Sequence, residues 1–187
     1  MIVLNVPYIQ GCIKNHRNMS RGFVKEDDQE EAPFIPPRAA LPPGAINYVT
    51  PQGYEMLLKE KSTLEKEISK LTLEEGKERR HTLAILNGKI NLLNDRISSA
   101  RILKPQDQSQ NEVRFGALVS FKFLSGEQKA AIKEFQIVGV DEANIKENKI
   151  AFVAPLAKAL TGKKLNEKTE VFMAGKLQEL EILSIAY

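Results

Sequence analysis

Few side chains in this sequence have the chemistry of a catalytic site. Cys12, the single cysteine, has no histidine or basic helix start beside it that would make its thiol a nucleophile. His16 and His81 lie in different parts of the chain, and no catalytic triad or metal-binding cluster is visible around them. Gly162-Lys163 lacks the earlier glycine and the following Ser or Thr of a phosphate-binding loop. We therefore expect no intrinsic catalytic residues, no stably bound metal and no cofactor held by the protein alone.

Acidic side chains gather at one break in the sequence pattern. Glu74, Glu75 and Glu78 stand around Gly76 and are interspersed with Lys77, Arg79 and Arg80. Glutamates beside a helical turn are usually ordinary solvated residues, and the alternative is a group of carboxylates presented at an exposed tip. The elements on either side decide where these carboxylates lie.

Two apolar repeats flank this break. Thr50 followed by Pro51 is a typical helix start, because Thr is a capping residue and proline needs no hydrogen-bond partner in the first turn. Apolar residues then recur at heptad-like steps on both sides, so we predict a coiled-coil hairpin over residues 50–104 with arms of about 22 to 26 residues. Pairing between two chains is the alternative. The predicted seam consists of Leu57, Leu64, Ile68, Leu71, Leu83, Leu86, Ile90, Leu93 and Ile97.

The segments around the hairpin differ in composition. Residues 1–49 are predicted to be an extended, acidic and proline-rich leader, and a start at Met19 would make residues 1–18 an upstream extension of the reading frame. Residues 105–112 form a polar linker. In residues 113–187, alternating apolar residues predict strands over 113–123, 132–140, 149–153, 169–173 and 178–186. A short helix is expected over residues 155–160, because Pro155 suits its first turn and Gly162 follows its end.

Composition limits the classes of function. The chain has 27 basic and 24 acidic residues, a formal net charge of +3, which is too balanced for binding nucleic acid by charge alone. Any contact with nucleic acid is expected to be indirect. No apolar run approaches the roughly 20 residues of a membrane helix. We expect a cytoplasmic protein without membrane contact.

Several residue blocks occur in a fixed order in the last part of the chain. They are Val113-Arg114-Phe115-Gly116, residues 137–145, residues 155–160, Gly162-Lys163, Glu181-Ile182 and the terminal Tyr187. These blocks resemble the C-terminal domain of the bacterial Gre transcription elongation factors, GreA and GreB. Residues 49–54, Val-Thr-Pro-Gln-Gly-Tyr, are similar to the start of that family's hairpin.

The resemblance implies an α+β protein that binds RNA polymerase. An N-terminal antiparallel coiled-coil hairpin would enter the secondary channel of the polymerase, and an FKBP-like antiparallel β domain with one short helix would sit on the channel rim. In cleavage-active members, two tip carboxylates help to hold a Mg²⁺ ion in the polymerase active site, where a hard cation prefers oxygen ligands. Such a factor is not itself an enzyme, because the polymerase performs the hydrolysis. We expect a monomer.

The sequence departs from the family at the tip. The Gly-Asp-x-x-Glu-Asn-like loop is absent, and only Glu74, Glu75 and Glu78 remain as tip candidates. The familiar factors also have longer arms, so this tip would stop on the order of 10 to 15 Å short of the catalytic metal. Three interpretations stay open: a factor that stimulates transcript cleavage, a channel-occupying regulator without cleavage that is similar to Rnk, and a coiled-coil assembly protein.

The rim contact of the family corresponds to an altered stretch in this chain. Val153-Ala154-Pro155 stands where the family has an acid, a serine and a proline, so docking here would depend on packing alone. Pro155 also fits a plain helix-start role. Asp141 and Glu142, at the end of a predicted strand, are further docking candidates. Their alternative role is to stabilise the turn.

Overall fold

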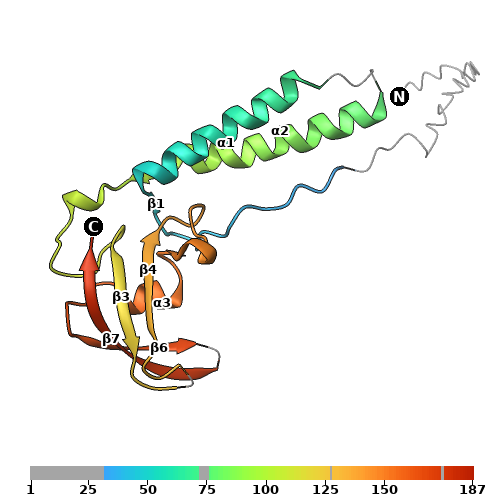
Figure 1. The fold of residues 1–187 in the computed structure, drawn as a ribbon. Coiled ribbons are helices and arrows are strands. Elements are labelled where there is room, and N and C mark those ends of the chain that lie inside the picture. The colour runs from blue at the N-terminus through green and yellow to red at the C-terminus, as the bar shows by residue number, and fades with distance from the viewer. Residues whose placement is uncertain (1–31, 72–75, 127, 174) are drawn as a thin grey trace, which may run out of the picture. The chain divides into compact units, whose positions relative to one another are not determined.

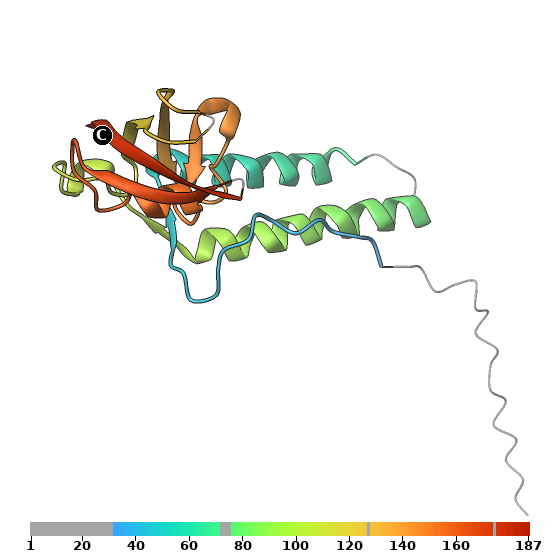
Figure 2. The same ribbon diagram turned by 90° about the horizontal axis from the view of Figure 1, so that it is seen from below.

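The computed structural model describes residues 32–71, 76–126, 128–173 and 175–187. Two helices lie side by side as a hairpin, and a curled five-stranded sheet follows them in the chain (Figures 1 and 2). The prediction of an α+β fold is confirmed. Within the described ranges, no helix combines the length and the apolar character needed to cross a membrane.

The hairpin begins where the sequence predicts. Helix α1 spans Pro51–Ser69, and the Thr50 hydroxyl at its N-cap accepts a hydrogen bond from the Gly53 amide. Helix α2 spans Lys77–Ser98 and ends where its pattern ends. The helices contain 19 and 22 residues, or about 28 and 33 Å at 1.5 Å per residue. Helix α1 is therefore shorter than the predicted arm.

The predicted seam residues lie mostly between the two helices. Leu57, Leu64, Leu86 and Leu93 are buried in one apolar cluster with Val49. Ile68, Leu71, Ile90 and Ile97 are partly buried against that cluster, and Leu83 is partly buried outside it. The buried leucines are seven residues apart on each helix, so each helix packs against the other along one face, as a heptad pattern requires.

A short parallel strand pair closes the base of the hairpin. Strand β1, Asn47–Val49, pairs with β2, Ala100–Ile102. The Asn47 side-chain amide donates a hydrogen bond of 2.9 Å to the Arg96 carbonyl at the end of α2. The end of the predicted leader is thus a strand of the folded unit, and the predicted hairpin interval also contains a strand.

The sheet has the strand order β5-β4-β3-β7-β6. Neighbouring strands are antiparallel except β4 and β5, which pair in parallel through three residues. The prediction of a wholly antiparallel domain is therefore wrong for β5. Alternation identifies strands but not their direction, and the connection over residues 139–148 carries the chain back so that β5 runs parallel to β4. The strands are β3 (Leu118–Phe123), β4 (Ile132–Val138), β5 (Lys149–Ala151), β6 (Lys168–Met173) and β7 (Lys176–Ala186).

One face of the sheet forms the core with the short helix α3, Pro155–Leu160, which has the predicted bounds. Phe121, Leu160 and Leu180 are each fully buried there. Strand β3 begins later than predicted, because Gly116 adopts a left-handed conformation with φ of 88° that turns the chain before the strand. Val113 instead donates its amide hydrogen bond to the Lys163 carbonyl beyond α3.

Candidate functional site

Glu74, Glu75 and Glu78 are the candidate carboxylates predicted for the hairpin tip. Glu74 and Glu75 lie outside the described residues. Glu78 is exposed in the first turn of α2, where a negative charge is favourable near the positive end of the helix dipole. Among the residues that the structure describes, no group of three or more His, Cys, Asp or Glu side chains is arranged to hold a metal ion.

The predicted docking stretch connects β5 to α3. Ala154 occupies the N-cap of α3 with no side-chain hydrogen bond, and Pro155 follows at its first position, as predicted. Val153 and Ala154 are half-buried, whereas Pro155 is exposed. A stretch without polar side chains can attract a partner only through shape and apolar contact.

Two cavities flank this stretch. Val153 lines a cavity of ≈ 530 Å³ next to the mutually packed rings of Tyr48, Phe115 and Phe152. Ala154 and Pro155 line a second cavity of ≈ 430 Å³ with a mostly apolar wall. The other residues of that wall are Phe123, Gln128, Lys133, Phe135, Ile145, Ile150, Leu156 and Met173. The side chain of Ile145 is prominent at this second cavity because the residue is 68% exposed.

Glu142 has a partner within the chain. Its carboxylate accepts a hydrogen bond of 2.6 Å from the hydroxyl of Thr50, the N-cap of α1, and the residue is 5% exposed. A Cβ atom on residue 53 would lie 2.5 Å from the same carboxylate oxygen, so any larger residue than glycine would displace that carboxylate. The turn after β4 is therefore bonded directly to the start of the hairpin.

Asp141 is held by two arginines from different segments. Arg38 Nε donates a hydrogen bond of 2.9 Å to Asp141 Oδ1, and Arg96 Nε on α2 lies 2.9 Å from Oδ2 as an ion pair. The Asp141 side chain is 8% exposed. In the free protein, both acidic docking candidates thus connect the turn to the hairpin and to the leader, and their docking role stays a prediction.

The contact between two of the similar blocks was not predicted from the sequence. Residues 49–54 and 137–145 each match the family pattern, and the structure brings them together at Thr50 and Glu142. A Cβ atom on Gly139 would also lie 2.9 Å from the Tyr48 carbonyl oxygen. Arg38 could not be found in this way, because it lies outside both blocks.

Comparison with known proteins gives consistent results. A family profile described as "Transcription elongation factor, GreA/GreB, C-term" matches residues 108–187. The chain is 32% identical over 154 residues to transcription elongation factor GreA of Thermodesulfovibrio yellowstonii, covering 74% of this chain and 96% of that protein. It is 38% identical over 100 residues to the GreA of Beijerinckia indica, covering 54% of this chain and 62% of that protein.

Two solved structures also align with the chain. One is the GreA factor homolog 1 of Thermus thermophilus, with 18% identity, a TM-score of 0.35, and coverage of 76% of this chain and 100% of that one. The other is a GreA/GreB factor from Nitrosomonas europaea, with 18% identity, a TM-score of 0.37, and coverage of 75% and 98%. On the sequence relationship, which extends over nearly the whole GreA of T. yellowstonii, this chain belongs to the GreA/GreB family of transcription elongation factors.

Proposed function

We propose that this protein binds RNA polymerase at the secondary channel, with the hairpin inserted and the β domain seated on the channel rim. As a Gre-family factor it is not itself an enzyme. Family membership supports the polymerase as partner, and contact with nucleic acid would be indirect, through the elongation complex. The observation that carries the proposal is the combination of a two-helix hairpin with a β domain that presents an apolar cavity.

The cavity lined by Ala154, Pro155 and Ile145 is the proposed rim contact. It opens beside α3. Lys133 and Gln128 are polar residues in its lining, and the rest of the lining is apolar. Burial of such apolar surface under a partner stabilises the complex by about 25 cal/mol per Å² buried. The loss of the acid and the serine of the family stretch therefore leaves a packing contact in place of a polar one.

The proposed action of the hairpin is to occupy the channel without delivering a metal ligand. Helix α1, at about 28 Å, is shorter than the arm expected from the sequence, and α2, at about 33 Å, is at the lower end of that expectation. Glutamate carboxylates at the tip are suitable oxygen ligands for the polymerase's Mg²⁺, but they act only if they reach it. A short hairpin supports occupancy over cleavage.

A backtracked elongation complex from the cognate polymerase distinguishes the two actions. Wild-type protein and the Glu74→Ala/Glu75→Ala variant are added in parallel, and RNA length and complex binding are measured. We expect binding by both proteins and no shortening of the transcript. Mg²⁺-dependent shortening that disappears in the double variant would make the protein a cleavage factor. Absence of binding at micromolar concentration would refute the channel proposal.

Chain association is tested separately. A coiled-coil assembly protein would associate through the same leucines that the structure buries between α1 and α2. Sedimentation equilibrium is expected to give the mass of one chain, 21.0 kDa. A dimer or larger assembly would favour the assembly function.

A further inference from the structure

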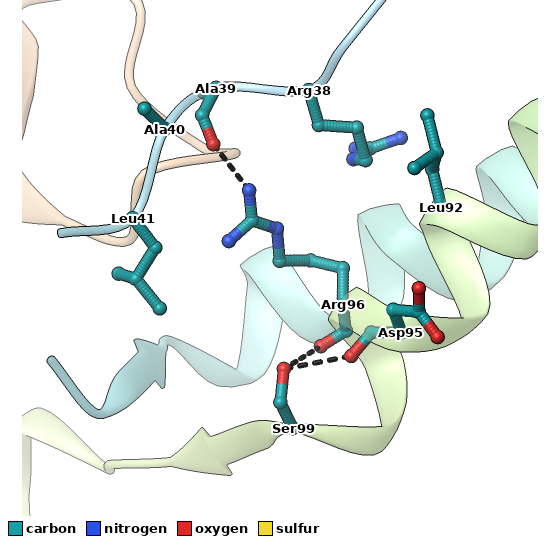
Figure 3. A pocket seen from close by; sticks show the side chains of 8 residues that line it. All are labelled: Arg38, Ala39, Ala40, Leu41, Leu92, Asp95, Arg96 and Ser99. Atoms are coloured by element: carbon teal, nitrogen blue, oxygen red, sulfur yellow. Dashed lines mark hydrogen bonds between the residues drawn. The ribbon is translucent and has the colours of Figure 1, made fainter. Parts of the chain in front are cut away.

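A proline-rich segment of the leader contacts both hairpin helices and the β domain. We call residues 33–41 the strap. The Arg38 guanidinium in the strap forms two hydrogen bonds with the Glu60 carboxylate on α1, of 2.8 and 3.0 Å, in addition to its bond with Asp141. Arg96 of α2 in turn donates a hydrogen bond to the Ala39 carbonyl, as Figure 3 shows. One arginine therefore connects the strap to α1 and to the turn after β4.

The strap also packs into a gap on α2. A Cβ atom added to Gly88 would lie 2.0 Å from the end of the Ile35 side chain. Glycine inside a helix is unfavourable relative to alanine, so a helix-interior glycine needs a packing reason. Contact with Ile35 provides that reason here. The Leu41 side chain follows further along, at a cavity of ≈ 340 Å³ beside Leu92 and Arg96 (Figure 3).

The charges at this junction are matched. Asp141 is nearly buried and faces two guanidinium groups, while Arg38 faces two carboxylates. The hydrogen bonds that Arg38 donates to Glu60 raise the pKa of Arg38, and Asp141 raises it further against the lowering effect of burial. Partly buried ion pairs are stable only in a narrow range of geometries, because a buried charge whose partner moves away is left without a counter-charge or water. The prolines of the strap restrict its unfolded conformations and so reduce the entropy lost on docking.

We propose that Arg38 is a positioning residue: the strap fixes the orientation of the hairpin relative to the β domain, and so decides where the hairpin tip points. The structure shows the required arrangement. The strap reaches both helices and the β domain, and Arg38 bonds to Glu60 within α1, whereas the direct contacts of the hairpin with the turn after β4, through Thr50 and Arg96, lie near its base. Loss of Arg38 leaves Asp141 paired with Arg96 alone, so the fold persists while the orientation is less restricted.

Pulsed electron paramagnetic resonance tests this on the free protein. Spin labels are attached at Lys66→Cys on α1 and Glu170→Cys on β6, both at exposed positions, in a Cys12→Ser background. The distance distribution is compared for the otherwise wild-type chain, Arg38→Ala and a deletion of residues 1–41. Phe34→Ala is the matched control, because this strap side chain is 83% exposed.

We expect a narrow distribution for the wild-type chain and Phe34→Ala, and a widened one for Arg38→Ala and the deletion. A wild-type distribution as wide as that of the deletion would overturn the proposal, as would unchanged width in Arg38→Ala. Equal widening by Phe34→Ala would overturn the assignment to Arg38. Polymerase is absent from this experiment, so its result is independent of the proposed channel binding.

Gly88→Ala gives a second test that leaves the charges unchanged. In the full chain the new methyl group would force the end of the Ile35 side chain to move, whereas in the chain lacking residues 1–41 only helix propensity acts. The substitution should therefore raise the urea midpoint of the shortened chain and raise that of the full chain less, or lower it. An equal rise in both chains would contradict contact between the strap and α2.

Discussion

Thr50 performs two tasks at the start of α1, so replacing it with valine should cost more than an ordinary capping change. Its oxygen accepts from the Gly53 amide at 2.8 Å, and its hydroxyl donates to the Glu142 carboxylate at 2.6 Å. Valine has nearly the same shape but provides neither bond. The substitution therefore separates hydrogen bonding from packing.

The magnitude follows from the two lost bonds. Loss of an N-cap residue costs about 1 kcal/mol. A carboxylate that stays buried without its donor costs about 1 to 3 kcal/mol more, and Glu142 is 5% exposed, so water cannot replace the hydroxyl readily. We expect Thr50→Val to lower the free energy of unfolding by about 2 to 4 kcal/mol.

Urea unfolding followed by far-UV circular dichroism measures this change, because the helices dominate the signal. Thr63→Val is the matched control: it is the same substitution in the same helix, at an exposed residue whose hydroxyl donates only to the Lys59 carbonyl. Its expected change is within about 0.5 kcal/mol. In a Glu142→Ala background, Thr50→Val should cost about 1 kcal/mol, since the acceptor of the Thr50 hydroxyl is gone and only the N-cap bond is lost. Equal losses in Thr50→Val and Thr63→Val would refute the reasoning.

Three further predictions concern the contact of Gly53 with Glu142, the proposed rim contact and the C-terminal Tyr187. Gly53→Ala should destabilise the protein by about 1 to 3 kcal/mol in the same urea assay, because the new Cβ atom would lie 2.5 Å from a Glu142 oxygen. Ile145→Ser should weaken polymerase binding about tenfold in a fluorescence titration while leaving the urea midpoint unchanged; unchanged affinity would contradict docking at the second cavity. Burial raises the pKa of Tyr187, whose hydroxyl donates to the Glu112 carbonyl and accepts from the Arg114 amide. Its contribution is therefore complete below the ordinary tyrosine pKa of about 10 and is lost as pH rises through the higher folded value, so Tyr187→Phe should flatten the alkaline fall in stability that thermal melts record.

The two long helices, α3 and the strands of the sheet follow from local sequence patterns and were predicted from them, whereas β1 and β2 were not. Thr50 and Pro51 start α1 because a capping hydroxyl and a ring without an amide hydrogen satisfy the first turn. Apolar residues at heptad steps and at alternate positions likewise determine which faces of the helices and strands are buried. Pro155 and Gly162 similarly bracket α3.

The connections between elements were decided only in the tertiary structure. The direction of β5, the bond between Thr50 and Glu142, and the contacts of Arg38 with Glu60 and Asp141 join residues distant in the chain. No local pattern encodes such pairs, because a carboxylate or a guanidinium has the same character in the sequence whether water or a distant partner solvates it. Asp141 and Glu142 thus had two possible roles in the sequence, and folding gave both an intramolecular partner because burial of a charge requires one.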